Sequence, residues 1–184
     1  IKKRSYEGKT IAEISKTLNV PPLEFVLDLL YEEDCKVSVI FFNMSEENLA
    51  RILKWDSVMI GSDSSLRSLE GVLNYGKPHP RGYGTFSRVI RKYVNETSIL
   101  SIEEAIYKMT GFPAQTLGLK DRGILKEGFF ADITIFDQET IAEQATFTSP
   151  HNYSTGIKHV LVNGKLTIND GKHESVTNGA ILKK

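Results

Sequence analysis

The chain has 184 residues, 40% of them apolar, and its 23 Lys and Arg residues balance 23 Asp and Glu residues. This is the composition of an ordinary globular protein, and the lack of net charge gives no electrostatic support for binding nucleic acid or an anionic membrane. The apolar runs are far shorter than a membrane span. A single cysteine, Cys35, excludes an internal disulfide and favours a cytoplasmic location.

The chain begins at Ile1 rather than at methionine, and no apolar stretch follows its first basic residues. The sequence therefore predicts no secretory signal. A missing start methionine is typical of a processed chain or of a piece of a longer protein, so we expect one of these two.

Two helices are predicted near the N-terminus. Thr10 and Glu13 have the spacing of a capping box, apolar residues follow at helical spacing, and Asn19 ends the first helix. Pro22 begins a second helix with one apolar face.

An alternation of strand and helix comes next. Residues 36–42 are β-branched and aromatic and predict a strand. Ser45 caps a predicted helix over residues 46–54, and the apolar run at residues 58–60 predicts a buried second strand. This order is typical of a parallel α/β unit.

Asp63 follows the second predicted strand, directly after Gly61 and Ser62. Loops at the C-terminal ends of parallel strands converge over the core, so a carboxylate there can be catalytic. An aspartate after a strand is also a common turn residue or helix N-cap. This short stretch alone leaves both interpretations open.

Residues 64–83 form a predicted irregular loop, and its length favours a functional role or disorder. Within it, His79 lies between Pro78 and Pro80, which stiffen the backbone just before Arg81. A guanidinium held in place can bind a carboxylate at two points. A proline-rich surface turn with an exposed arginine is the alternative interpretation.

The rest of the chain changes from helix to strand. Helices are predicted over residues 84–94 and again from the capping box at Ser101 to about residue 117. After these, glycines separate short β segments, and Asn163-Gly164 predicts the turn of a hairpin. We therefore expect two domains, residues 1–120 and residues 121–184.

A series of short motifs runs through these elements in a fixed order. They are Gly61-Ser62-Asp63, Lys77-Pro-His-Pro-Arg81, Gly84-Thr-Phe-Ser-Arg88, Lys108-Met-Thr110, Pro113-Ala114, Leu117-Gly118-Leu119, Asp121-Arg-Gly-Ile-Leu-Lys-Glu-Gly128, Ala131-Asp132, Phe136-Asp137 and Val162-Asn-Gly164. Together, over about residues 36–175, they resemble the C-terminal portion of an N-acyl-D-amino-acid deacylase (D-aminoacylase) of the amidohydrolase superfamily.

The resemblance implies an α/β fold. The family has a metal-dependent (β/α)8 (TIM) barrel joined to a small β-sandwich. This chain would hold the last part of the barrel, with residues 58–60 as the eighth strand, and the C-terminal strands of the sandwich.

The resemblance also implies roles for three residues in the full-length parent. Asp63 would take a proton from the metal-bound water and pass it to the leaving nitrogen, and Arg81 would hold the free carboxylate of the substrate. His79 would line the pocket or position Arg81. Ser64 stands where the family commonly has glycine, which leaves open the D-amino acid side chain that is accepted.

Zinc is the cofactor that the resemblance implies, bound by His and Cys residues upstream of this chain. The histidines present are His79, His151, His159 and His173, and none forms a His-x-His pair or a pair four residues apart. Because a zinc site needs three or four converging ligands, we expect no metal bound by this chain alone. His159 is expected to be half-buried in a strand, and the last two loop histidines, His151 and His173, are expected at the surface.

The preferred function is therefore that of a parent enzyme that hydrolyses N-acyl-D-amino acids, with this chain inactive by itself. The alternatives are a hydantoinase-like or dihydroorotase-like enzyme that acts on cyclic amides, and a non-catalytic binding or scaffold chain. The expected partners are the small-molecule substrate, the missing N-terminal part of the enzyme and, through exposed apolar edges, further copies in a homo-oligomer.

Overall fold

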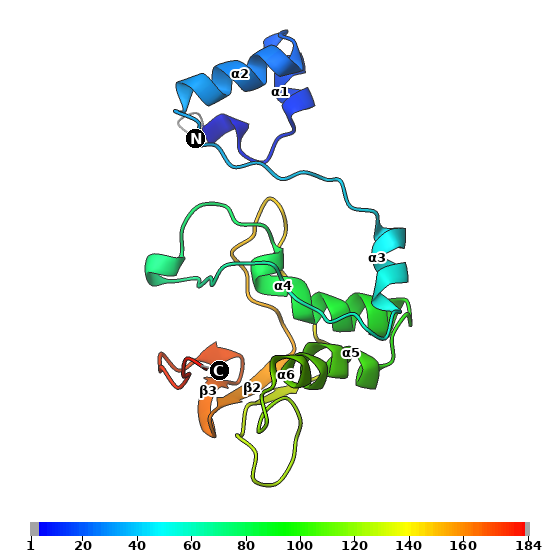
Figure 1. Cartoon of the computed structure of the whole chain (residues 1–184). Helices are drawn as coiled ribbons and strands as arrows, with labels where there is room; N and C mark the ends of the chain where they lie inside the picture. Colours follow the sequence, from blue (N-terminus) through cyan, green and yellow to red (C-terminus); the bar gives the residue numbers. More distant parts are fainter. Residues whose placement is uncertain (1–3, 183–184) are drawn as a thin grey trace. The chain divides into compact units, whose positions relative to one another are not determined.

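The computed structural model describes residues 4–182 and is shown in Figure 1. The chain divides into two compact units, Ile1–Asn43 and Met44–Lys184. The predicted boundary near residue 120 lies inside the second unit and stays a prediction. No helix within the described range combines the length and the apolar character that a membrane crossing needs.

The first helix of the first unit begins and ends as its sequence predicts. α1 (Ile11–Leu18) starts with a complete capping box, in which the Thr10 hydroxyl accepts from the Glu13 N–H at 3.1 Å and the Glu13 carboxylate accepts from the Thr10 N–H at 2.7 Å. It ends at Asn19, whose backbone is left-handed with φ 55°. Both signals are local, which is why the sequence suffices to place this helix.

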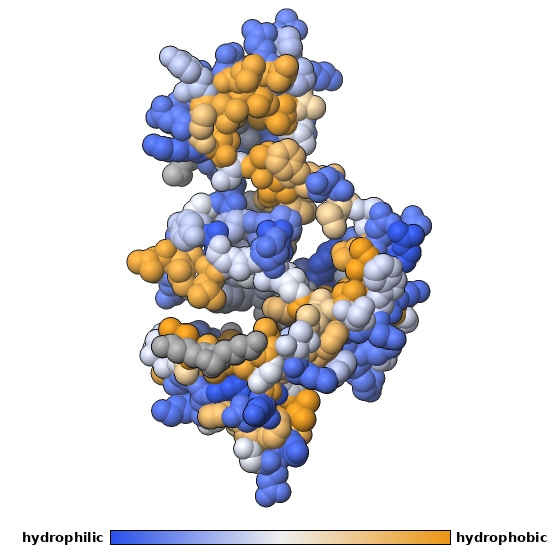
Figure 2. All heavy atoms as spheres, in the orientation of Figure 1, coloured by the Kyte–Doolittle hydropathy of each residue, from blue (hydrophilic) through white to orange (hydrophobic). Residues whose placement is uncertain are grey.

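The second helix of this unit leaves an apolar face uncovered. α2 (Pro22–Glu32) begins at its proline, as predicted, and the residues expected to form a loop at the chain start include a short 3-10 turn, η1 (Arg4–Tyr6). On α2, Leu23 and Leu27 are 71% and 58% exposed, and Figure 2 shows an orange apolar patch on this unit. Pairing of apolar surface with another segment or another copy stays a prediction.

Helices build the first part of the second unit. They are α3 (Glu46–Leu53), α4 (Arg81–Arg88), the π-helix η3 (Val89–Glu96), α5 (Ile102–Met109) and α6 (Gly111–Leu117), with a 3-10 turn, η2 (Gly71–Leu73), in the long loop. The helix predicted from residue 84 begins already at Arg81, because Pro80 has helical dihedrals and its carbonyl accepts from the Gly84 N–H at 3.1 Å.

The core of the second unit lies where η3 meets α3 and α5. Its buried members are Leu53, Val89, Tyr93, Val94, Leu100 and Ala105. Half of these side chains come from η3, which runs on from α4 without a break. The helix that begins at Arg81 is therefore fixed at its far end by apolar packing.

The two strands predicted before Asp63 are not formed. Residues 36–42 and 58–60 pair with no strand within residues 4–182, and the first of them runs as an extended trace in Figure 1. A strand needs at least one hydrogen-bonded neighbour, and residues 4–182 supply none for these two segments. The apolar and β-branched composition of the two segments predicted strands, but neither segment forms a strand in this structure.

The second part of the unit is a small antiparallel sheet in the order β1-β2-β3-β4. Its strands are β1 (Ile133–Phe136), β2 (Ile157–Val162), β3 (Lys165–Asn169) and β4 (Lys172–His173). Asn163 and Gly164 turn β2 into β3 with φ 51° and 75°. This is the two-residue hairpin that the Asn-Gly pair predicts, since both positions need positive φ.

Asn163 and Asp132 fasten this hairpin to the segment that leads into the sheet. Asp132 Oδ1 accepts from the Asn163 N–H at 2.7 Å, and the Arg122 guanidinium bonds the Asp132 carboxylate and, at 2.7 Å, Asn163 Oδ1. Arg122, Asp132 and Asn163, which belong to three of the motifs, therefore have a structural role: they hold the hairpin against the segment before β1.

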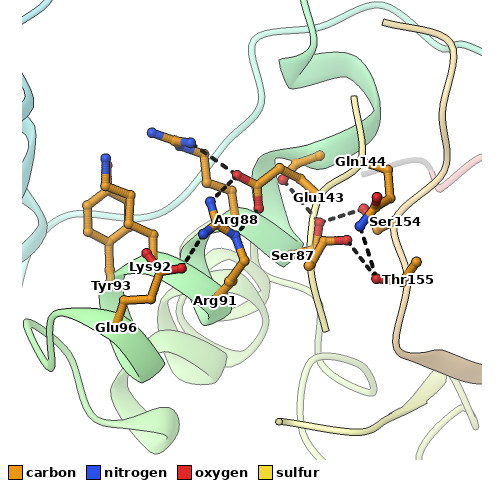
Figure 3. A network of polar contacts seen from close by, with 12 residues as sticks. Ser87, Arg88, Arg91, Lys92, Tyr93, Glu96, Glu143, Gln144, Ser154 and Thr155 are labelled. Carbon is orange, nitrogen blue, oxygen red and sulfur yellow. Dashed lines mark hydrogen bonds and ion pairs between the residues drawn. The ribbon is translucent and has the colours of Figure 1, made fainter. Parts of the chain in front are cut away.

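A carboxylate network ties the helices to the long segment between β1 and β2 (Figure 3). Glu143 accepts from Arg91 through both oxygens, at 2.7 and 2.5 Å, and from Arg88 at 3.1 Å. Nearby, the Ser87 and Ser154 hydroxyls lie 2.6 Å apart. The Glu143 side chain is only 13% exposed. Burial raises the pKa of Glu143, but the hydrogen bonds and charges of the two arginines outweigh it and leave the pKa below its ordinary value.

Replacing Glu143 should destabilise the second unit. Glu143→Ala leaves two half-buried guanidinium groups without their shared carboxylate, so we expect a loss of about 2 kcal/mol in the free energy of unfolding, measured with urea. Glu139→Ala, at an exposed position of the same segment, is the control. The lowered pKa implies that the difference is full above pH 4.5 and shrinks as the pH falls through the folded-state pKa. Equal stability of the two variants at pH 7 would contradict this assignment.

Candidate active site

Asp63 stands in an exposed and unusual backbone position. Its side chain is 89% exposed, and its backbone is left-handed with φ 48°. Residues other than glycine enter this region at an energetic cost, and Asp and Asn tolerate it best because their short polar side chains bond locally. Backbone strain of this kind is typical of functional positions.

Arg81 lies beside Asp63, although the long loop separates them in the sequence. The Arg81 Nη2 atom is 2.8 Å from Asp63 Oδ2, and Arg81 is the first residue of α4. Because both side chains are largely exposed, the pair itself adds less than about 1 kcal/mol of stability. Its significance is geometric: the guanidinium of Arg81 is placed where a carboxylate can reach it.

His79 holds the backbone of Arg81. Its Nδ1 accepts from the Arg81 N–H at 3.0 Å, and its ring packs edge-on against Phe147 with centroids 5.1 Å apart. An accepting Nδ1 carries no proton, so the ring is neutral with its proton on Nε2. Burial, assisted by the positive charge of Arg81, lowers the pKa of His79. Of the two roles expected for His79, this geometry supports the positioning of Arg81.

Ser64 lies against the first turn of α4. A Cβ atom placed on Gly82 would come within 2.8 Å of Ser64 Oγ and 3.3 Å of Arg67 Cγ. Glycine at position 82 therefore permits a close approach that keeps the start of the loop next to Arg81.

Residues that the sequence analysis missed anchor the loop between Asp63 and Arg81. The Tyr83 hydroxyl donates to the Ser68 carbonyl at 2.8 Å, and His151 Nε2 donates to the Gly76 carbonyl at 2.8 Å. His151 Nδ1 also lies 3.1 Å from the Tyr83 hydroxyl, and the Tyr153 ring packs beside the Tyr83 ring. His151 was expected at the surface, but it is partly buried and links two segments.

The tip of the same loop is apolar and exposed. Val72 in η2 is 92% exposed and Leu66 is 82% exposed. Figure 1 draws η2 as the short green helical turn at the left, without a label, and Figure 2 shows an orange, apolar surface at the same place. The loop is therefore anchored at residues 68–69 and at Gly76, and it presents exposed apolar side chains at Leu66 and Val72.

The remaining histidines lie in the sheet region, where their Nδ1 atoms accept from backbone N–H groups. His159 accepts from Asp170 at 3.4 Å, and His173 accepts from Ser175 at 3.0 Å. Within the described residues, no group of three or more His, Cys, Asp or Glu side chains is close enough to hold a metal ion. The side chains of this part of the chain do not fit a zinc site by themselves. The location of the zinc ligands upstream stays a prediction.

The profile of the amidohydrolase family matches residues 56–168, and the chain belongs to this family. Within it, the chain is 43% identical over 130 residues to N-acyl-D-glutamate deacylase of Alcaligenes xylosoxydans xylosoxydans, which covers 71% of this chain and 25% of that protein. It is 42% identical over 125 residues to D-aminoacylase of the same organism, covering 68% and 24%. A dihydroorotase of Endomicrobium trichonymphae matches over 58 residues, at 41% identity, covering 32% and 14%.

Solved structures agree with these relatives. A D-aminoacylase with a binuclear metal centre superposes with a TM-score of 0.80 at 32% identity, over 96% of this chain and 35% of that chain. The N-acyl-D-glutamate deacylase of Bordetella bronchiseptica, complexed with zinc and a phosphonate inhibitor, gives a TM-score of 0.74 at 33% identity, over 94% and 35%.

The resemblance to N-acyl-D-amino-acid deacylases is therefore confirmed, as is the predicted fold class of a partial α/β barrel with strands of a small β-sandwich. The chain spans about a quarter of the length of the curated relatives that it matches.

The protonation state of His79 can be tested directly by nitrogen NMR of the imidazole ring. We expect Nε2 protonated and Nδ1 unprotonated at pH 7, and a titration midpoint below 6.5. Since the folded state favours the neutral ring, its stabilising contribution is complete above pH 6.5 and is lost as the pH falls through the lowered pKa. A midpoint at or above 6.5, or a proton on Nδ1 at pH 7, would contradict the hydrogen bond to Arg81.

Proposed function

We propose that this chain is the C-terminal part of a zinc-dependent enzyme that hydrolyses N-acyl-D-amino acids to a carboxylate and a free D-amino acid. The observation that carries the proposal is the placement of Arg81 beside Asp63, 2.8 Å apart, at the start of α4. The names of the relatives and of the superposed structures support the same substrate class.

In this proposal Arg81 anchors the free α-carboxylate of the substrate. The start of α4 fixes its Cα, the ring of His79 fixes its N–H, and the side chain is 44% exposed, so a ligand can reach it. The contact with Asp63 uses only Nη2, so other donors of the guanidinium remain for a second carboxylate.

Asp63 is the proton relay of the proposed reaction. Its carboxylate takes a proton from the hydrolytic water and gives it to the departing amide nitrogen, which becomes the free amine of the D-amino acid.

A zinc ion bound by other parts of the parent would supply an activated water at neutral pH. The described residues alone do not fit such a site, and we propose that the isolated chain is inactive. The zinc ligands and the remaining barrel strands would then come from the part of the enzyme that precedes this chain.

The alternative is an enzyme that acts on cyclic amides, as a dihydroorotase does. The shorter match to a dihydroorotase covers 32% of the chain, against 71% for the N-acyl-D-glutamate deacylase, and so favours the linear substrate. The full-length enzyme, loaded with zinc, should release free D-amino acid from N-acetyl-D-amino acids and should not open hydantoin or dihydroorotate. Ring opening without release of a D-amino acid would decide for the alternative.

Arg81 should act mainly on substrate affinity. In the full-length enzyme, Arg81→Met removes a charge-assisted hydrogen bond to the substrate carboxylate, so we expect the KM to rise about 10- to 100-fold. Arg81→Lys keeps the charge but loses the planar fork, and it should recover only part of the affinity. Arg51→Met, on an exposed face of α3, is the control. An unchanged KM in Arg81→Met would exclude Arg81 as the anchor.

Asp63 should act on the turnover rate instead. Asp63→Asn retains the shape of the side chain but cannot carry a proton, so we expect the kcat to fall about 100- to 10,000-fold with a smaller change in KM. Metal content should be measured on the same samples, so that loss of zinc is recognised. A metal-loaded Asp63→Asn enzyme with a kcat within threefold of the wild type would exclude the relay, since a positioned acid or base contributes far more.

A further inference from the structure

Lys108 is a buried lysine with no carboxylate at ion-pair distance among the described residues. It is only 5% exposed, and within the described residues its ammonium group forms no ion pair. Lysine side chains are almost never buried unless they are paired, because removing the charge from water costs free energy. The groups that its ammonium binds should therefore explain why a lysine is buried here.

The ammonium group of Lys108 binds backbone carbonyls just after α3. Its Nζ lies 2.5 Å from the Trp55 carbonyl oxygen and 3.3 Å from that of Val58. α3 ends at Leu53, so both carbonyls lie in the turn that follows the helix, where the Trp55 carbonyl also accepts from the Val58 N–H at 3.2 Å. The ammonium group is a second donor to the Trp55 carbonyl and links it to the Val58 carbonyl.

The backbone of Lys108 holds the same segment a second time. Its carbonyl accepts from the Ile60 N–H at 3.1 Å, and the Ile60 side chain packs against the core formed by η3, α3 and α5. Lys108 therefore binds the stretch from Trp55 to Ile60 at three backbone atoms. Asp63 lies three residues after Ile60.

Within residues 4–182, residues 58–60 pair with no strand, and α5 holds them through Lys108. In the proposed parent the neighbouring barrel strands would add a hydrogen-bond ladder, and Lys108 would hold the same segment from the side of α5. Arg81, in contrast, is carried by α4, which is fixed through η3 and Glu143 and does not contact Lys108 in any hydrogen bond of the described residues. The two members of the candidate site thus have different polar supports, while η3, α3 and α5 share one apolar core.

We propose that Lys108 is a positioning residue for Asp63: its buried ammonium and its carbonyl fix the segment that sets where the Asp63 carboxylate lies. The expected change in kcat rests on the proposed function. The expected effect on the backbone of residues 58–63 does not. The proposal predicts that loss of the ammonium impairs proton transfer by Asp63 and leaves the binding of the substrate carboxylate by Arg81 intact.

The test uses the full-length, zinc-loaded enzyme and three variants. Lys108→Met removes the charge at similar volume, and Lys108→Gln keeps one donor for a carbonyl. Lys165→Met is the control, because Lys165 is an exposed lysine at the start of β3. The kcat and KM for an N-acetyl-D-amino acid are measured with amide hydrogen exchange over residues 58–63 and 81–88.

For Lys108→Met we expect the kcat to fall about 10- to 100-fold, as small displacements of a catalytic group do, with the KM within about twofold of the wild type. Exchange should accelerate over residues 58–63 and stay unchanged over residues 81–88. Lys108→Gln should lie between wild type and Lys108→Met in both readouts, and the control should match the wild type. If Lys108→Met does not fold, Lys108→Gln alone decides, by a lowered kcat at unchanged KM.

A folded, metal-loaded variant with wild-type kcat would overturn the proposal, and so would equal exchange over residues 58–63. A wild-type enzyme that releases no D-amino acid would instead refute the proposed function. In that case the exchange over residues 58–63 still decides whether Lys108 holds this segment.

Discussion

The contact between Glu143 and the two arginines Arg88 and Arg91 is the interaction on which the second unit depends most. It joins the helix formed by α4 and η3 to the long segment between β1 and β2. The segment in turn carries His151 and Tyr153, which anchor the loop between Asp63 and Arg81. Three charged groups outside the candidate site therefore help to hold that loop.

The candidate site is assembled from three pieces that are held by different polar contacts. Arg81 is carried by a helix whose far end lies in the apolar core, and His79 fixes its backbone. Asp63 is carried by a segment bound to α5 through Lys108. The loop between them is held from the sheet side. This separation explains why substitutions in one piece are expected to change binding and turnover independently.

Local signals allowed much of this to be predicted from the sequence. The capping boxes at Thr10 and Ser101 and the Asn163-Gly164 turn lie at the expected positions, because each depends on residues within a few positions of one another. Residues 36–42 and 58–60 form no strand within the described residues, because a strand exists only with its neighbours, and their place in the barrel of the parent stays a prediction.

The contacts of His151 and Lys108 could not have been predicted either. His151 bonds a carbonyl in a loop far from it in the sequence, and no periodic pattern marks such a pair. Lys108 lies in a short motif of the family, yet a single lysine on an amphipathic helix normally indicates a solvent-facing position. Both residues act through backbone carbonyls, which have no sequence signature.

Because the backbone of Asp63 is left-handed, an aspartate at the same position of a related sequence is not by itself evidence of a catalytic carboxylate. At φ 48° the favourable residues are Gly, Asn and Asp, so an aspartate can persist at this position for the conformation of the chain alone. Alanine would combine the loss of the carboxylate with added backbone strain, whereas asparagine removes only the charge. A related chain with Asp here but no arginine at the start of the following helix would retain the turn without the pair that defines this site.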